Sequence, residues 1–367
     1  MSDFDVVVVG GGVVGLSVAW MAASEGLSVA LVDDEPGSGA TFAAGGMLAP
    51  ASEVSYGEEP LLALCLASAE RYPRFVADLE SCSNTSVGYR TSGTLIVARD
   101  LDEKAQLDEL YSLQQALGLS TRRMNAAECR RLQPALAPIV RGGVLAENDH
   151  SVDNRALSRA LAVACVRARV SVKTARATEV SPSLVKTSAG ELVRGGAVVL
   201  AAGAESGAIR GMPPEIAASV RPVKGQLLHL SGPVERPLLS MTVRGTGTYL
   251  VPRGDGRLIV GATVEEAGFD TRVTAGAVFE LLRAAYELVP GVVELTLTET
   301  VVGLRPGSID NAPLIGETSV PGLFAATGHY RNGILLAPVT ACALVERLVT
   351  GTAPALIESF SPLRFAA

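Results

Sequence analysis

A short apolar run followed by closely spaced glycines restricts the fold of this chain more than any other feature of its sequence. Residues 5–9 (DVVVV) are rich in β-branched side chains, as is typical of a parallel strand buried on both faces. Gly10, Gly12 and Gly15 then complete G-x-G-x-x-G, and apolar residues follow at helical spacing as far as Gly26. A second strand is predicted over 27–32 and is followed at once by Asp33. This order predicts an α/β unit of the Rossmann type that binds a dinucleotide.

Each residue of this motif has a physical reason to be there. Gly10 permits a sharp turn, Gly12 lets the backbone approach a pyrophosphate, and Gly15 lets the helix pack closely on the strand. The amino terminus of the helix then faces the anion. Asp33 can accept hydrogen bonds from ribose hydroxyls and would repel a 2′-phosphate. NAD and FAD share this fingerprint, so the motif alone leaves both cofactors open, and a glycine-rich turn without a ligand is the less favoured interpretation.

Further strands that run into glycine-rich segments are spread over the chain. Residues 37–50 (GSGATFAAGGMLAP) are nearly all small, which suits a backbone that runs close along an extended ligand. Similar junctions occur at 197–207 and 323–333. We therefore predict a discontinuous cofactor-binding domain made of residues 1–85, 147–220 and 310–367. Residues 86–146 and 221–309 would form a second domain, with strands over 221–230, 247–251 and 257–262.

Composition excludes several other classes of protein. The chain has a formal net charge of −7 and no long run of Lys or Arg, which argues against a nucleic-acid partner. Four glycines interrupt the apolar run at 6–20, and Asp3 and Asp5 precede it, so we expect neither a targeting segment nor a membrane span. Five scattered cysteines without a CxxC pair predict a reduced, cytoplasmic location. Three well-separated histidines give no reason to expect a metal site.

Six motifs, in order, resemble the D-amino-acid oxidase family of FAD-dependent oxidoreductases, and most closely its bacterial glycine oxidase branch, which is associated with thiamine biosynthesis. They are VVVVGGGVVGLSVAW, AAGGMLAP, RPVKGQ, YLVPRGDGRLIVGAT, GLRPGSIDNAPLIG and GHYRNGILLAPVTA, and together they extend over nearly the whole chain. The resemblance implies a Rossmann-like FAD-binding domain of the glutathione-reductase type. It also implies a smaller substrate domain built on a mainly antiparallel sheet.

The cofactor implied by the resemblance is FAD, bound without a covalent link because no cysteine lies near GLRPG. Beside Gly10, Gly12 and Gly15, the implied contacts of the adenine, ribose and pyrophosphate are Val13, Val14, Asp33, Asp34 and Ala177. The implied contacts on the flavin side are Ala40, Thr41, Gly45, Gly46 and Met47. The isoalloxazine ring would lie along His329, Tyr330, Arg331, Asn332, Gly333, Ile334 and Leu335.

The substrate clamp implied by the resemblance consists of Tyr249, Arg305 and Arg331. A guanidinium can hold a carboxylate through two hydrogen bonds, and a phenol can add a third. Arg305 is expected in a turn, within GLRPGSID. The implied reaction transfers a hydride from Cα of a small amino acid to flavin N5. Water then hydrolyses the imino acid to an oxo acid and ammonia, and oxygen is reduced to hydrogen peroxide.

Three residues depart from the pattern of close glycine oxidases, and two of these departures leave the substrate open among glycine, sarcosine, D-alanine and D-proline. Gly247 stands where histidine is expected, Val264 replaces methionine and Asp33 replaces glutamate. The first two would widen the pocket. A dehydrogenase that passes electrons to a quinone, a flavin-binding scaffold without catalysis and a nicotinamide dehydrogenase are the alternatives. Close relatives suggest a homotetramer.

Overall fold

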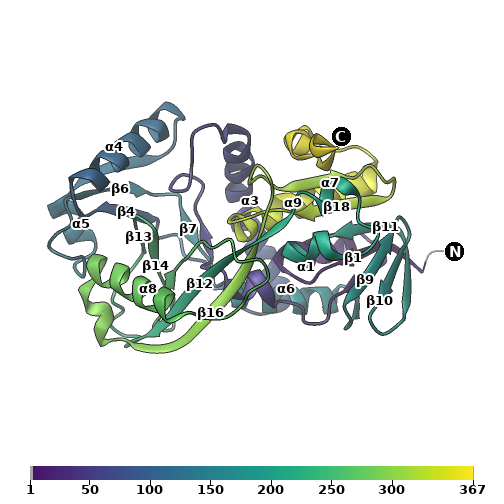
Figure 1. The fold of residues 1–367 in the computed structure, drawn as a ribbon, viewed down its shortest axis with the longest axis horizontal. Helices are drawn as coiled ribbons and strands as arrows, with labels where there is room; N and C mark the ends of the chain where they lie inside the picture. Colours follow the sequence, from purple (N-terminus) through teal and green to yellow (C-terminus); the bar gives the residue numbers. More distant parts are fainter. Residues whose placement is uncertain (1–2, 367) are drawn as a thin grey trace.

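The computed structural model describes residues 3–366 and arranges them around two large sheets, which occupy opposite sides of the view in Figure 1. The first sheet has the order β17-β18-β11-β1-β2-β8, and the pairs along this order are parallel except the edge pair β17–β18. A hairpin joins the same sheet through an antiparallel pair with β11. Its strands are β1 (Phe4–Val9), β2 (Val29–Val32), β8 (Ser171–Lys173), β11 (Leu192–Leu200), β17 (Leu314–Glu317) and β18 (Leu323–Thr327). The central strands come from distant parts of the sequence, as the junctions between strands and glycines predicted.

The two faces of this sheet are covered differently. Val6 and Val8 of β1 pack against helices, whereas Val7 and Val9 pack against a hairpin. The helices on the first face are α1 (Val13–Ser24), α3 (Glu59–Ser83), α6 (Asn154–Arg167) and α9 (Gly333–Thr350). The hairpin on the second face is β9 (Ala177–Ser181) and β10 (Leu184–Thr187). Burial on both faces explains the continuous apolar run of β1.

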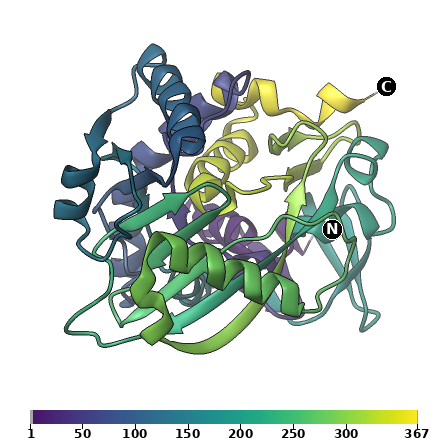
Figure 2. The same ribbon diagram turned by 60° about the vertical axis from the view of Figure 1, so that its left-hand side comes forward.

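The second sheet has the order β16-β12-β15-β14-β13-β4-β6-β5, and only the β13–β4 pair is parallel. Its strands are β4 (Thr94–Ala98), β5 (Thr121–Asn125), β6 (Gly142–Ala146), β12 (Arg221–Ser231), β13 (Thr242–Gly245), β14 (Thr248–Pro252), β15 (Arg257–Gly261) and β16 (Thr296–Gly307). Helix α8 (Ala275–Leu288) covers one face through Leu281, Ala285 and Leu288 and lies in front of the sheet in Figure 2. Helices α4 (Leu101–Ala116) and α5 (Ala126–Leu132) lie at the far end of the sheet.

The other face of the second sheet is turned toward the first sheet. Here α2 (Gly39–Ala43) packs on β16, where a Cβ added to Gly303 would lie 2.6 Å from the Cβ of Ala43. A short ribbon of β3 (Met47–Leu48) and β7 (His150–Ser151) also lies in this region. The short helix α7 (Pro214–Ala217) and the 3-10 turns Gly203–Ala208, Pro290–Glu294, Ala355–Phe360 and Pro362–Phe365 complete the fold.

Helix α9 is long and apolar enough to cross a membrane by length and composition. In the structure 61% of that segment is buried, with Leu335, Leu336 and Leu344 in the core cluster shared with α1 and α3. Its apolar character is therefore explained by packing inside the protein, and it is the one such helix of 18 residues or more among residues 3–366.

The predicted fold class, α/β with a mainly antiparallel second sheet, is confirmed. The prediction of a turn around Arg305 is wrong, because this residue lies within the long edge strand β16 and is paired with Val223. Two prolines, Pro306 and Pro222, lie opposite each other at that end of the pair. Proline is tolerated in edge strands, so it does not mark the end of this strand.

Candidate active site

A cavity of about 720 Å³ runs between the two sheets. The first sheet contributes the loops after β1, β2, β11 and β18, and the second contributes the inner faces of β12, β14 and β16. Most of the residues predicted to contact FAD or substrate line this cavity. They are Gly10, Gly12, Val13, Val14, Asp33, Asp34, Ala40, Thr41, Gly45, Gly46, Met47, Ala177, Tyr249, Arg305, His329, Tyr330, Arg331, Gly333 and Ile334.

Three of the predicted FAD contacts lie outside the wall of the cavity. Gly15 lies where a Cβ would collide with the carbonyl oxygen of Gly10, so its role is the close packing of α1 on β1. Asn332 precedes α9 and lines a small neighbouring pocket. Leu335 is 2% exposed in the core beneath, where its carbonyl oxygen accepts a hydrogen bond from the Ser68 hydroxyl. These three residues therefore do not line the cavity, and their contact with the cofactor stays a prediction.

The glycine-rich turn leaves backbone donors free for an anion. Gly10 has φ +105, and a Cβ there would lie 2.5 Å from the carbonyl carbon of Ala201. Thr41 Oγ1 accepts a hydrogen bond from the Val13 N–H at 2.9 Å. Within residues 3–366 the N–H groups of Gly12 and Val14 have no acceptor. Free N–H groups at a helix amino terminus bind phosphate, so this end of the cavity fits the pyrophosphate of a dinucleotide.

The acidic end of the cavity fits a ribose. Asp33 Oδ2 accepts a hydrogen bond from the Gly11 N–H at 2.6 Å, and Oδ1 accepts one from the Glu35 N–H at 2.7 Å. Each oxygen keeps a further lone pair, which can accept a ribose hydroxyl. Arg176, which was not predicted, lies next to Ala177 on this wall, donates to Glu205 at 2.8 Å and lies 3.8 Å from Asp34.

The loop that carries Gly45 and Gly46 is fastened to the second sheet by a buried arginine. Arg253 Nη2 donates to the Gly45 carbonyl oxygen at 2.9 Å and to Asn154 Oδ1 at 3.1 Å. The Val152 N–H donates to the Gly46 carbonyl oxygen at 2.8 Å. Burial lowers the pKa of Arg253 to about 10, which still leaves the guanidinium charged at neutral pH. This network fixes the position of the loop relative to β14.

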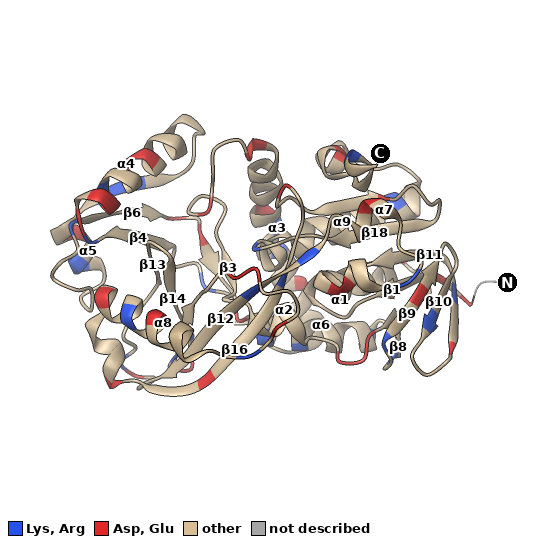
Figure 3. Ribbon diagram, viewed as in Figure 1, with Lys and Arg blue, Asp and Glu red and all other residues tan. Residues whose placement is uncertain are grey.

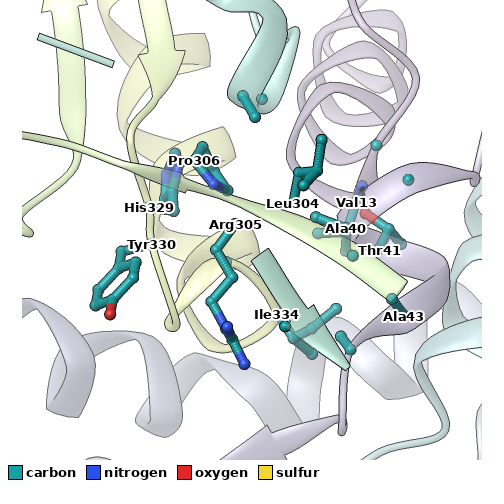
Figure 4. A pocket seen from close by; sticks show the side chains of 18 of the residues that line it. Val13, Ala40, Thr41, Ala43, Leu304, Arg305, Pro306, His329, Tyr330 and Ile334 are labelled. Carbon is teal, nitrogen blue, oxygen red and sulfur yellow. Dashed lines mark hydrogen bonds between the residues drawn. The ribbon is translucent and has the colours of Figure 1, made fainter. Parts of the chain in front are cut away.

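The predicted clamp residues Tyr249 and Arg305 come together on the inner face of the second sheet. The phenol of Tyr249 lies across Gly261 on the neighbouring strand, where a Cβ would be 2.6 Å from its Cε2. The guanidinium of Arg305 lies across Gly225 of β12. Figure 4 shows its side chain extending from β16 into the cavity between the labelled Tyr330 and Ile334. Both side chains thus lean toward the middle of the sheet from opposite directions.

Only some of the hydrogen-bond donors of Arg305 and Tyr249 have an acceptor in the protein. Arg305 Nη1 donates to the carbonyl oxygens of Thr263 at 3.1 Å and Lys224 at 3.3 Å. Its Nε and Nη2 have no protein acceptor among the described residues, and neither has the Tyr249 hydroxyl. Burial raises the pKa of the Tyr249 phenol, which therefore stays protonated and can donate. A guanidinium edge and a phenol O–H that face a cavity suit a carboxylate.

The third clamp residue lies in the segment before α9. Tyr330 has φ +47, and its N–H donates to the Pro306 carbonyl oxygen at 2.8 Å, which ties this segment to the end of β16. Arg331 lines the cavity but is exposed, and its guanidinium carbon lies 5.0 Å from the centre of the Tyr330 ring. The imidazole of His329 is buried and bonded to Thr340 at 3.0 Å, and burial lowers its pKa to about 3. His329 is therefore neutral, and the amino terminus of α9 supplies the partial positive charge here.

Two further charged residues on the wall were missed by the sequence analysis. Arg244 lies directly opposite Tyr249 in the β13–β14 pair, and its Nη1 donates to Glu53 Oε1 at 2.9 Å. Neither Arg244 nor Glu53 belongs to a local sequence motif. Only the pairing of β13 with β14, which the sequence analysis did not predict, brings Arg244 to the cavity.

The comparisons with known proteins identify the family. Residues 5–347 match the DAO family, described as FAD dependent oxidoreductase. The chain belongs to this family. Membership confirms FAD as the cofactor and settles the choice against NAD. The free N–H groups at α1 and the acceptors of Asp33 fit such a cofactor.

Particular relatives cover nearly the whole chain. It is 35% identical to the glycine oxidase of Geobacillus kaustophilus, over 95% of this chain and 94% of that protein. The crystal structure of glycine oxidase from Geobacillus kaustophilus superposes with a TM-score of 0.91 at 33% identity and covers 98% of both chains. The chain is also 33% identical to the bifunctional protein ThiO/ThiG of Synechocystis, but spans only 54% of it, about half its length.

Proposed function

We propose that this protein is a glycine oxidase that uses non-covalently bound FAD to oxidise glycine or a similarly small amine in thiamine biosynthesis. The observation that carries the proposal is the convergence of Arg305 and Tyr249 over Gly225 and Gly261, beside a cavity that fits a dinucleotide. Relatives named glycine oxidase and ThiO support the choice of amine. Among the described residues that line the cavity there is no cysteine, which supports non-covalent binding.

The residues of the chain bind and orient the substrate in this proposal. The free edge of Arg305 and the phenol of Tyr249 hold the carboxylate, and Arg331 adds a second positive charge from the exposed side. Bound FAD supplies an acceptor for the hydride that leaves Cα. No side chain has to remove the Cα proton, so the protein acts by orientation and by keeping the amine neutral. Water hydrolyses the imino acid to glyoxylate and ammonia, and oxygen is reduced to hydrogen peroxide.

The predicted division of the chain remains part of the proposal. Residues 1–85, 147–220 and 310–367 would form the FAD domain, and 86–146 and 221–309 the substrate domain. We also keep, as proposals, a cytoplasmic location, from the scattered cysteines, and a homotetramer, from the family resemblance. Residues Val13, Val14, Asp34, Ala40 and Met47, with the other residues of the wall named above, are the proposed cofactor contacts.

Anaerobic reduction of the yellow holoenzyme tests the proposal. Glycine or sarcosine should bleach the flavin absorbance, whereas a protein that only binds flavin would stay oxidised with every amine. Readmitted oxygen should then restore the colour with release of one hydrogen peroxide per amine. If the colour returns only with an artificial quinone, the protein is a dehydrogenase and not an oxidase.

A further inference from the structure

The cavity carries a guanidinium that the binding of glycine does not use. Arg244 and Tyr249 are directly opposite in an antiparallel pair, so their side chains leave the same face of the sheet, with Cβ atoms about 4.5–5.5 Å apart. Both line the cavity. The face therefore presents Arg244 on one side of the phenol and Arg305 on the other.

The hydrogen bonds of Arg244 occupy only part of its guanidinium. Nη1 donates to Glu53 Oε1 at 2.9 Å and to Ser52 Oγ at 3.4 Å. Nε and Nη2 have no protein acceptor among residues 3–366. The side chain is 20% exposed, and that of Glu53 is 14% exposed. The edge of the guanidinium formed by Nε and Nη2 can therefore donate two hydrogen bonds to a second carboxylate.

The charges around the substrate end also favour an additional anion. Arg244, Arg305 and Arg331 contribute three positive charges to the wall, and Glu53 contributes one negative charge. A single substrate carboxylate leaves one of these positive charges without a partner. In Figure 3 both signs of charge are scattered over the ribbon of the whole molecule, so an excess of one sign on this wall is a local feature.

There is space for a substituent on this side of the cavity. In the described part of the chain, apart from the two neighbouring residues, no atom lies within 4 Å of a Cβ added to Gly247, in the turn between β13 and β14. Val264 also lines the cavity and is 64% exposed. A group attached to the substrate can therefore extend past the phenol toward Arg244.

We infer that Arg244 selects amino acids that carry a second carboxylate, with the first held by Arg305 and Tyr249. The inference rests on the proposed function and names a substrate class for the same site. The second carboxylate can be attached to the amine nitrogen, as in iminodiacetate, or to Cα, as in D-aspartate. Two electrons leave the Cα–H bond as hydride to FAD and pass to oxygen. The amine also loses its proton, and water would hydrolyse the resulting imine to glyoxylate and glycine for iminodiacetate, or to oxaloacetate and ammonia for D-aspartate, with one hydrogen peroxide formed per turnover.

The test compares each diacid with its neutral amide on the holoenzyme. Iminodiacetate is paired with N-(carbamoylmethyl)glycine, and D-aspartate with D-asparagine, so that shape is nearly constant within a pair. We expect kcat/KM to be at least about tenfold higher for the acid in one or both pairs, because a charge-assisted bidentate contact is worth more than a neutral one. The pair that shows the ratio identifies the point of attachment.

Two variants connect that ratio to Arg244. In Arg244→Gln the ratio of acid to amide should fall to about one, whereas in Glu53→Gln it should rise, because Arg244 loses its competing partner. Arg283→Gln, an exposed arginine on α8, is the control and should keep the wild-type ratio. A wild-type ratio near one in both pairs, or a ratio that persists in Arg244→Gln, overturns the inference. If the inference about Arg244 is overturned in this way but glycine is still oxidised, the proposed function stands. If none of these amines reduces the flavin, both the inference and the proposed function fail.

Discussion

The guanidinium of Arg305 lies over the α-carbon of Gly225, close enough that a Cβ at residue 225 would be 2.5 Å from Nη2. These two residues are on adjacent strands, β16 and β12, and Arg305 is paired not with Gly225 but with Val223. The side chain therefore crosses its neighbouring strand diagonally to reach the Thr263 carbonyl oxygen. The Arg305 guanidinium can occupy this position only because residue 225 is a glycine, which has no Cβ.

Gly225→Ala should displace the Arg305 guanidinium without removing it. We expect kcat/KM for glycine to fall by about 100-fold, since a misplacement of about 1 Å in a binding group can cost that much. FAD content, measured from the visible spectrum, should be unchanged. Gly276→Ala, where a Cβ meets no atom within 4 Å, is the matched control and should keep full activity. Equal activity of the two variants would contradict the assigned position of Arg305.

Arg305→Ala should raise the KM for glycine much more than it affects FAD binding. Losing one partner of a charged, partly buried pair costs about 3 kcal/mol, or roughly 100-fold in kcat/KM. Arg305→Lys should recover little, because an ammonium cannot donate to Thr263 and to both carboxylate oxygens in one plane. Steady-state peroxide assays with all three proteins decide this. Wild-type kcat/KM in the alanine variant would exclude the proposed clamp.

Arg253→Met should weaken FAD binding because the loop at Gly45 loses its anchor. Two hydrogen bonds disappear, to the Gly45 carbonyl oxygen and to Asn154, and we expect the Kd of FAD to rise about tenfold. Titration of the apoprotein with FAD, followed by flavin fluorescence, measures this change. Arg210→Met removes an exposed arginine that pairs with Glu179, and should leave the Kd of FAD at its wild-type value.

His229→Leu should change how stability depends on pH. Both ring nitrogens of His229 are buried and have no hydrogen-bond partner among residues 3–366. Burial lowers the pKa of His229 from 6.5 to about 4, an effect to which Arg155 adds and which Glu299 opposes. The unfolded chain binds a proton below pH 6.5 while the folded protein does not, so this histidine costs stability as the pH falls from 6.5 toward 4.

The variant removes that cost. Relative to wild type, its free energy of unfolding should rise by about 2 kcal/mol between pH 7.5 and pH 5.0. Urea unfolding of both proteins at the two pH values provides the measurement. A difference between the two proteins that does not change with pH would mean that His229 has the same pKa in the folded protein as in the unfolded chain.

Local patterns allowed much of the fold to be predicted. The strand Phe4–Val9 and the helix that follows the glycines, Val13–Ser24, lie where the apolar pattern predicts them, and the capping box of Asn125 and Glu128 marks the start of α5. These features depend on neighbouring residues, which a sequence displays directly. The strand assignment of Arg305 could not be predicted in the same way, because pairing with β12, some 80 residues away in sequence, extends β16 through Pro306.

The residues of the site also divide into those that a local motif predicts and those that long-range pairing brings together. Gly10, Gly12 and Asp33 belong to a motif whose spacing specifies their contacts, and the structure places them on one wall. Glu53 and Arg244 are 191 residues apart and meet only through the position of β13 in the sheet. No local sequence pattern predicts the contact between Glu53 and Arg244. The excess of positive charge at the substrate end of the cavity is therefore seen only in the structure.

The two glycines beneath Arg305 and Tyr249 also determine where the protein can be redesigned. Any side chain at Gly225 or Gly261 would displace a clamp residue, so the floor of the site tolerates no variation. Around Gly247 the space is empty, although its φ of +73 restricts replacements there to residues such as asparagine, and Val264 is exposed. Laboratory selection for new amines should therefore accumulate its substitutions along this rim, while the grip on the carboxylate is inherited unchanged.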